Sequence, residues 1–219
     1  MRLIAHRGFA NRHPENTLVA IERAVPAADM IELDVRRCGS GELVVIHDET
    51  VDRVTDATGL VGELSATNLA NLDVLDTGTG VPTLAAAADA IPEDTGIVID
   101  CKEQSVATEA VAAASTVENE VIVSSFDAST LDALETDDPT VELAYLIGLR
   151  PDEDLDDALA LDCSYIHPHW GHWLLTDAID RAHDAGMDVN VWTIDTSIAI
   201  ERLRRAGVDG VIADSPDVL

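Results

Sequence analysis

Two histidines and two carboxylates lie at the ends of apolar runs within the first 47 residues of the chain. His6 ends one run, His47 ends another, and Glu32 and Asp34 are separated by one residue at the end of a third. Because side chains alternate along a strand, both carboxylates point to the same side, as two ligands of one cation must. Imidazoles that transfer protons beside a bound cation could catalyse hydrolysis.

Three further charged residues fit the same chemistry. Asp100 and Lys102 lie at the end of a later apolar run, and Arg7 follows the first histidine. Glu32, Asp34 and Asp100 would supply oxygen ligands only, which favours one hard divalent cation, Mg²⁺ or Ca²⁺. Arg7 and Lys102 would hold an anionic phosphate. The set therefore predicts a hydrolase that acts on phosphate esters.

The composition is that of a globular protein with one core. With 219 residues and 47% apolar residues, we expect a single domain over residues 1–219. No apolar stretch approaches the roughly 18 residues of a membrane helix, and the apolar run after Met1 is too short for a signal peptide. We therefore expect a cytoplasmic protein. Three widely spaced cysteines, Cys38, Cys101 and Cys163, fit reduced thiols that pack in the interior.

The chain is strongly acidic, with 42 Asp and Glu residues against 13 Lys and Arg and a net charge of -29. This charge argues against nucleic acid and anionic membranes as partners. The acids are spread among apolar patterns, so we interpret them as a solvated surface adapted to high salt. At molar salt the Debye length is only about 3 Å, which screens self-repulsion. Nothing in the sequence indicates the oligomeric state.

The apolar runs predict an α/β fold with eight strands. Helical periodicities separate the later runs, and Gly186 and Gly207 are placed to end two of those helices. Asn16 or Thr17 could cap the first helix. Eight strands that alternate with helices favour a closed (β/α)₈ TIM barrel, with an open doubly wound sheet as the alternative. The expected strands are residues 3–5, 30–34, 96–101, 121–125, 141–147, 164–167, 188–193 and 208–213.

One apolar run, residues 42–47, follows the second strand too closely for a parallel crossover, which needs about a dozen residues. We expect it to be the return arm of a hairpin that brings His47 to the site. Residues 48–80 are polar, and we expect a short loop insertion over the active site with one helical turn near 66–72. The sequence ends at Leu219, so the last helix should be truncated or missing.

In such a barrel, functional side chains lie at the carboxyl ends of the strands. Trp192 and Ser125 end predicted strands, and we expect both to line the pocket. His167, His169 and His172 would also suit a transition metal. A proline and a glycine make that segment irregular, however, and the carboxylates already explain a metal.

Several blocks of this sequence resemble the glycerophosphodiester phosphodiesterase family, in order and over essentially the whole chain. The blocks are His6-Arg7-Gly8, Pro14-Glu15-Asn16-Thr17, Glu32-Leu33-Asp34-Val35, His47-Asp48-Glu49-Thr50-Val51-Asp52-Arg53, Ile99-Asp100-Cys101-Lys102, Ser124-Ser125-Phe126-Asp127, Val191-Trp192-Thr193 and Gly207-Val208-Asp209-Gly210-Val211-Ile212-Ala213-Asp214-Ser215-Pro216.

The resemblance implies a (β/α)₈ barrel that hydrolyses glycerophosphodiesters to glycerol 3-phosphate and an alcohol with a divalent metal. It implies that His6 and His47 are the acid and the base. Carried over by position, the metal ligands and phosphate contacts of the family fall on Glu32, Asp34, Arg7 and Lys102.

Two departures from the family pattern keep alternatives open. Asp100 stands where the family usually has glutamate, which shortens its reach by one methylene group. The insertion after His47 is lean, which favours a related phosphodiesterase that acts on a lysophospholipid headgroup. A non-catalytic metal-binding barrel is the second alternative, although the joint presence of both histidines and Arg7 favours an enzyme.

Overall fold

The computed structural model describes residues 1–134, 141–148, 150–173 and 178–219. The strands are β1 (Arg2–His6), β2 (Met30–Arg37), β3 (Leu43–Val45), β4 (Gly96–Cys101), β5 (Val121–Ser125), β6 (Val141–Ile147), β7 (Tyr165–Pro168), β8 (Asp188–Ile194) and β9 (Gly210–Ala213). The α-helices are α1 (Leu18–Ala24), α2 (Ala66–Ala70), α3 (Leu84–Asp89), α4 (Ala107–Ala114), α5 (Ala128–Asp132), α6 (Pro151–Ala160), α7 (Trp170–Trp173), α8 (Ala178–Asp184) and α9 (Ile200–Arg205).

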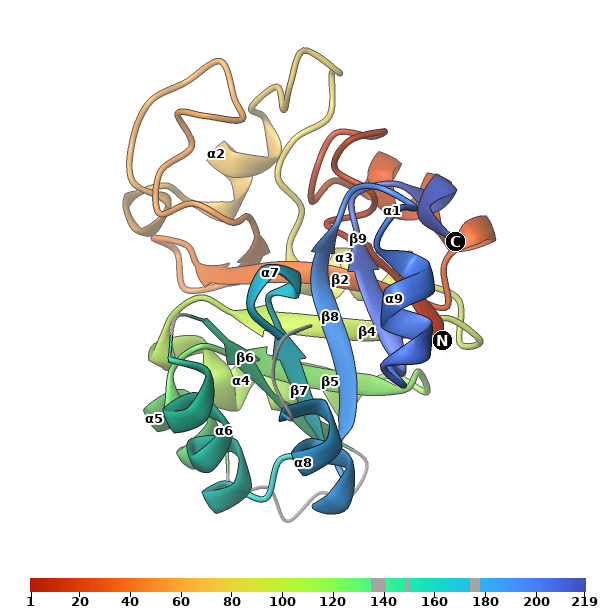
Figure 1. Cartoon of the computed structure of the whole chain (residues 1–219). Coiled ribbons are helices and arrows are strands. Elements are labelled where there is room, and N and C mark those ends of the chain that lie inside the picture. Colours follow the sequence, from red (N-terminus) through yellow and green to blue (C-terminus); the bar gives the residue numbers. More distant parts are fainter. Residues whose placement is uncertain (135–140, 149, 174–177) are drawn as a thin grey trace.

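Eight parallel strands form a closed barrel with helices around it (Figure 1). Strand β1 closes the barrel because it pairs with β2 on one side and with β9 on the other. Strand β3 lies outside this ring and pairs antiparallel with β2, with Val35 opposite Val45. The predicted (β/α)₈ barrel and the predicted hairpin at residues 42–47 are both confirmed, and the open sheet is excluded.

Alternation along the strands divides the barrel into an outer and an inner set of side chains. The outward-facing residues pack against the helices in one large apolar cluster. The inward-facing residues form a layer across the barrel that comprises Ile4, Met30, Val98, Ile122, Ala144, Tyr165 and Ile212. Two residues further along each strand, the same inner face reaches the carboxyl end of the barrel. His6, Glu32 and Asp100 lie there, each two residues after the inward-facing Ile4, Met30 and Val98. The alternation of side chains along the strands therefore places the three together.

The insertion of residues 48–80 has an apolar core of its own, which the sequence analysis did not anticipate. Its buried residues, with their neighbours from β3 and the flanking turns, are Cys38, Val44, Ile46, Val51, Val54, Val61, Leu69, Val74 and Val81. Helix α2 supplies Leu69, and Ser65 caps this helix through a capping box with Asn68. The predicted helical turn is therefore present, and it rests on a small separate cluster beside the barrel (Figure 1).

The predicted helix boundaries are also observed. The Thr17 hydroxyl accepts a hydrogen bond from the backbone N–H of Ala20 at the start of α1. Gly186 and Gly207 adopt left-handed φ angles of 84° and 81° after α8 and α9. After β9 the chain forms a 3₁₀ turn, η4 (Pro216–Val218).

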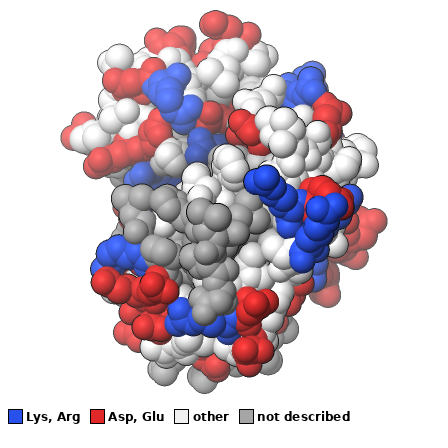
Figure 2. All heavy atoms as spheres, in the orientation of Figure 1, with Lys and Arg blue, Asp and Glu red and all other residues white. Residues whose placement is uncertain are grey.

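Acidic side chains are spread over the visible face of the molecule in several groups (Figure 2). All three cysteines are buried and free, as predicted. Within the described residues, no helix is both long and apolar enough to cross a membrane.

Replacing Gly8 by alanine should destabilise the protein more than the same change at Gly186, which has a similar φ angle. At φ 76°, a Cβ on Gly8 would lie 2.7 Å from the Cβ of Ala20 in α1, whereas a Cβ on Gly186, at φ 84°, would meet nothing within 4 Å. Both Gly→Ala changes cost roughly 1 to 2 kcal/mol for the left-handed conformation. Gly8→Ala adds a steric clash and should therefore lower the free energy of unfolding further in urea denaturation. Equal losses in the two variants would contradict this packing.

Candidate active site

A cavity of about 310 Å³ opens at the carboxyl end of the barrel. It brings together six of the charged or ionisable residues that the sequence analysis selected, whereas Asp34 is not part of its lining and has no exposed surface. Its lining comprises His6, Arg7, Glu32, His47, Val98, Asp100, Lys102, Ser124, Phe126, Leu146, His167, Trp192, Thr193 and Ile212.

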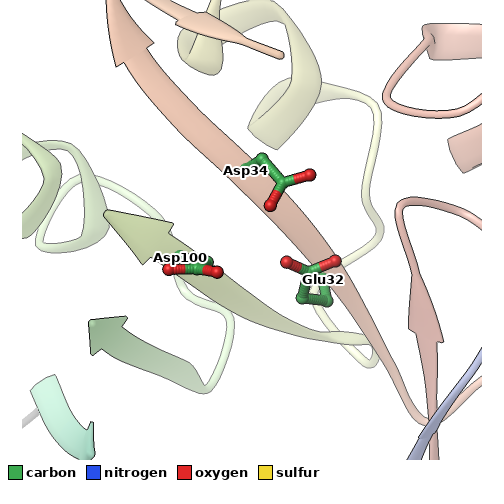
Figure 3. Close-up of side chains that lie close together, drawn as sticks. All are labelled: Glu32, Asp34 and Asp100. Atoms are coloured by element: carbon green, nitrogen blue, oxygen red, sulfur yellow. The ribbon is translucent and has the colours of Figure 1, made fainter. Parts of the chain in front are cut away.

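Three buried carboxylates form the acidic centre of this site. Glu32 and Asp34 project from β2, and Asp100 projects from the neighbouring strand β4, where the backbone register places it opposite Asp34 (Figure 3). One ligand oxygen from each lies within 4.8 Å of the others. The Oδ1 atom of Asp100 is buried and has no hydrogen-bond partner among the described residues. An oxygen-only set with a free buried oxygen fits a hard divalent cation.

Two cations partly neutralise the three carboxylates. Arg7 Nε lies 2.9 Å from Asp34 Oδ2, and Lys102 Nζ lies 2.7 Å from Asp34 Oδ1. Lys102 also forms an ion pair with Asp100. Two positive and three negative charges leave the cluster with a formal charge of -1 when all are ionised. Lys102, whose side chain is 12% exposed, is therefore a partly buried member of the site.

Burial and the neighbouring charges together shift the pKa values of the three carboxyl groups in opposite directions. Burial raises the pKa of Glu32 to about 7, and the charge of Asp34 acts in the same sense. Burial also raises the pKa of Asp100. Burial opposes ionisation of Asp34 as well, but Lys102 and Arg7 outweigh it and hold the pKa of Asp34 below its usual value. The cluster thus contains one firmly ionised carboxylate and two that resist ionisation.

The loop after β1 gives the carboxylates further partners. Arg7, Gly8 and Phe9 all have positive φ angles, of 52°, 76° and 67°. This tight turn directs the backbone N–H of Arg7 to Glu32 Oε2, at 2.9 Å. Asn16 donates from its amide to Asp34 Oδ2 at 2.8 Å, so Asn16 supports the acidic centre while Thr17 caps the helix.

Each of the two histidines is oriented by an aspartate. His6 Nδ1 lies 2.6 Å from Asp214 Oδ1, and His47 Nδ1 lies 2.6 Å from Asp48 Oδ1. These contacts leave the Nε2 atoms for other partners, and that of His6 lies 4.0 Å from Glu32. Burial lowers the pKa of His6, but the charges of Glu32 and Asp214 outweigh burial and raise it overall.

A chain of ion pairs connects His47 to Arg7. Arg7 Nη1 lies 3.0 Å from Glu15 Oε1, and Arg53 contacts both oxygens of Glu15 at 2.7 and 2.8 Å. The Nε atom of Arg53 donates to Asp48, the partner of His47. The sequence analysis gave Glu15 and Asp48 no role, because nothing in their spacing indicates this contact.

The opposite wall of the cavity is largely apolar. Trp192 lines it as predicted and contacts Phe126 edge-on, with ring centroids 5.5 Å apart. Ser125 does not line this cavity, which corrects the prediction. Its hydroxyl donates to the Cys101 carbonyl at 3.2 Å, while the preceding Ser124 faces the cavity.

Among the described residues, the histidines at the end of β7 and just after it do not belong to the group with metal-ligand geometry. His167 is buried inside the barrel, and the side chain of His172 lies outside the described residues. Among the described residues, the group with metal-ligand geometry comprises Glu32, Asp34 and Asp100.

Comparisons with known proteins identify the family of this chain. Residues 6–218 match the model of the glycerophosphoryl diester phosphodiesterase family. A glycerophosphodiester phosphodiesterase of Caldanaerobacter subterraneus subsp. tengcongensis is 32% identical over 233 residues, which cover 99% of this chain and 95% of the relative.

Solved structures share the fold of this chain. The glycerophosphodiester phosphodiesterase of Thermotoga maritima superposes with a TM-score of 0.88 at 26% identity, covering 100% of this chain and 96% of that one. A phosphodiesterase of Oleispira antarctica in complex with the product sn-glycerol-3-phosphate gives 0.86 at 26% identity, covering 100% and 95%. The chain belongs to the glycerophosphoryl diester phosphodiesterase family.

Proposed function

We propose that this protein hydrolyses glycerophosphodiesters to glycerol 3-phosphate and an alcohol. The observation that carries the proposal is the arrangement of two aspartate-oriented imidazoles, the cationic side chains of Arg7 and Lys102 and a group of three buried carboxylates at one cavity. The bound product in the Oleispira antarctica phosphodiesterase supports the substrate class. Membership of the family and the geometry of the residues therefore favour the same reaction.

Glu32, Asp34 and Asp100 would hold one divalent cation, Mg²⁺ or Ca²⁺. When bound, this ion would supply charge neutralisation to the phosphate in the transition state. The formal charge of the cluster with Arg7 and Lys102 is -1, so a divalent ion would bring it to +1. The centre would then attract an anionic phosphodiester instead of repelling it.

The remaining steps fall to residues of the chain. Arg7 and Lys102 bind phosphate oxygens from positions that their ion pairs with Asp34 maintain. The Nε2 atom of one imidazole accepts the proton of the nucleophile, and that of the other protonates the departing alcohol oxygen. The nucleophile is water or a hydroxyl of the glycerol, which would give a cyclic phosphate first. Each proton transfer contributes roughly 10² to 10⁴ to the rate.

A lysophospholipid is the second candidate substrate. Phe126 lines the cavity and is 47% exposed, so the mouth of the cavity presents an aromatic surface to solvent. Such a surface could contact the apolar part of a lipid. Release of ethanolamine from glycerophosphoethanolamine, which leaves glycerol 3-phosphate, and from lysophosphatidylethanolamine, which leaves an acylglycerol phosphate, separates the two substrates when each is measured with and without chelator. Release from neither would support the non-catalytic barrel.

Replacing either imidazole of the acid and base pair should abolish most turnover. His6→Ala and His47→Ala should each lower kcat at least 100-fold, because each removes one proton-transfer group. His183 contacts Asp209 at 2.9 Å, away from the cavity, so His183→Ala serves as the matched control and should keep kcat. Circular dichroism should show that all three variants fold. Near-normal turnover in His6→Ala or His47→Ala would remove that histidine from the mechanism.

Stabilisation by the cation should depend on pH. The folded-state pKa of Glu32, about 7, lies above its reference value of 4.5. Its contribution to stability is therefore complete below pH 4.5 and is lost as the pH rises through about 7. Mg²⁺ or Ca²⁺ should offset that loss, so each should raise the melting temperature more at pH 8 than at pH 5.5.

Glu32→Gln is the control for this measurement, because glutamine has the same shape and does not titrate. The variant should show a smaller difference between the two pH values. An equal effect of the cation at both pH values in the unmodified protein would contradict a shared site at Glu32.

Arg53 should affect turnover although it lies outside the described cavity lining. Arg53→Gln removes the connection between Glu15 and Asp48, so His47 loses part of its orientation. We expect kcat to fall about tenfold with little change in KM, a loss typical of partners that orient site residues. Arg150 forms an exposed ion pair with Glu153, and Arg150→Gln is the control. The interpretation fails if both variants behave alike in steady-state kinetics.

A further inference from the structure

His167 is a buried imidazole to which the acid and base chemistry gives no role. It lies on the inner face of β7, lines the cavity and has 0% exposed surface. Burial lowers the pKa of this histidine to about 3, so the ring is neutral at physiological pH. A neutral imidazole carries one N–H donor and one acceptor nitrogen. The position of that single proton decides what the ring can bind.

The neighbouring strand determines which nitrogen carries the proton. Asn190 on β8 is also buried, and its Nδ2 lies 3.2 Å from His167 Nε2. An amide nitrogen only donates, so Nε2 is the acceptor and the proton resides on Nδ1.

Gly210 on β9 provides the space for this orientation of the amide. A Cβ at Gly210 would lie 2.2 Å from Asn190 Oδ1, so a larger residue there would displace the amide from His167.

The Nδ1–H group of His167 has no partner among the described residues. A buried donor without an acceptor is costly, and most such groups in proteins are paired. The surrounding wall offers little to pair with, because Leu146, Trp192 and Ile212 contribute mainly apolar surface. The indole N–H of Trp192 is itself used, since it donates to the His167 carbonyl. The donor therefore suits an acceptor that arrives with the substrate.

We propose that the Nδ1–H of His167 donates a hydrogen bond to a hydroxyl oxygen of the glycerol half of the substrate. The proposal rests on the proposed function and deepens it. Glycerol is the half that all substrates of this class share, and the buried donor lies on the enclosed, uncharged wall. The leaving alcohol varies between substrates, and the mouth, where Phe126 is exposed, can accept groups of different size. His167 is thus a specificity residue that distinguishes glycerol phosphates from other phosphates.

Two ligands test the assignment directly. sn-Glycerol 3-phosphate and n-propyl phosphate have the same three-carbon chain and phosphate, but propyl phosphate lacks both hydroxyl groups. Calorimetric titration in saturating Mg²⁺ gives the Kd of each for the unmodified protein and for His167→Leu. We expect the unmodified protein to bind glycerol 3-phosphate more tightly. His167→Leu should weaken that ligand about tenfold, as for one lost hydrogen bond, and propyl phosphate less than twofold.

His167→Asn is the second variant, in case leucine disturbs folding. Its amide can place an N–H near the former Nδ1, so it should retain part of the preference for glycerol 3-phosphate. Melting curves of both variants check that they fold.

Equal weakening of both ligands in these variants would show a merely structural role and overturn the proposal. The absence of any preference in the unmodified protein would overturn it as well. Hydrolysis of glycerophosphoethanolamine by the unmodified protein is measured separately, so a failure of the proposed function is recognised independently of the binding result.

Discussion

Repulsion among three buried carboxylates is the constraint on which the rest of the site depends. Barrel geometry imposes it, because the parallel register of β2 and β4 places Asp34 beside Asp100, and alternation turns Glu32 to the same face. Burying like charges is unfavourable unless opposite charges compensate. Arg7 and Lys102 supply two of the charges required. The remaining negative charge favours a bound cation, and the same ion pairs hold the side chains of Arg7 and Lys102, for which we propose phosphate binding.

The ion pairs also connect parts of the chain that pack in separate apolar clusters. Arg7 follows β1, whereas Arg53 belongs to the insertion with its own apolar core, and Glu15 joins the two guanidinium groups. His47 follows strand β3 and contacts Asp48, which accepts a hydrogen bond from Arg53 of the insertion. The proposed acid and base are therefore oriented by different parts of the chain, His6 by Asp214 after β9 and His47 by Asp48 in the insertion. The insertion must pack against the barrel in the observed position for His47, as well as His6, to face the cavity.

Local patterns in the sequence predicted the parts of the fold that depend on local rules. The eight strands followed from apolar runs, the hairpin from a linker too short for a crossover, and the facing carboxylates from alternation. Where local rules gave no answer, prediction failed. A strand end does not reveal which of Ser124 and Ser125 faces inward. The contact of His6 with Asp214 spans 208 residues, and only closure of the barrel creates it. His167 was grouped with a histidine-rich loop, although its position on the inner face follows from the parity of β7.

The central claim, that the acidic cluster is a receptor for one divalent cation, is tested most directly by anomalous diffraction. Crystals grown with Mn²⁺, which also prefers oxygen ligands, would reveal the ion by its anomalous signal. This account predicts a single strong peak bonded to carboxylate oxygens of Glu32, Asp34 and Asp100, and no such peak in crystals of the Asp34→Asn variant. A peak at other residues, or no peak at saturating Mn²⁺, would contradict it.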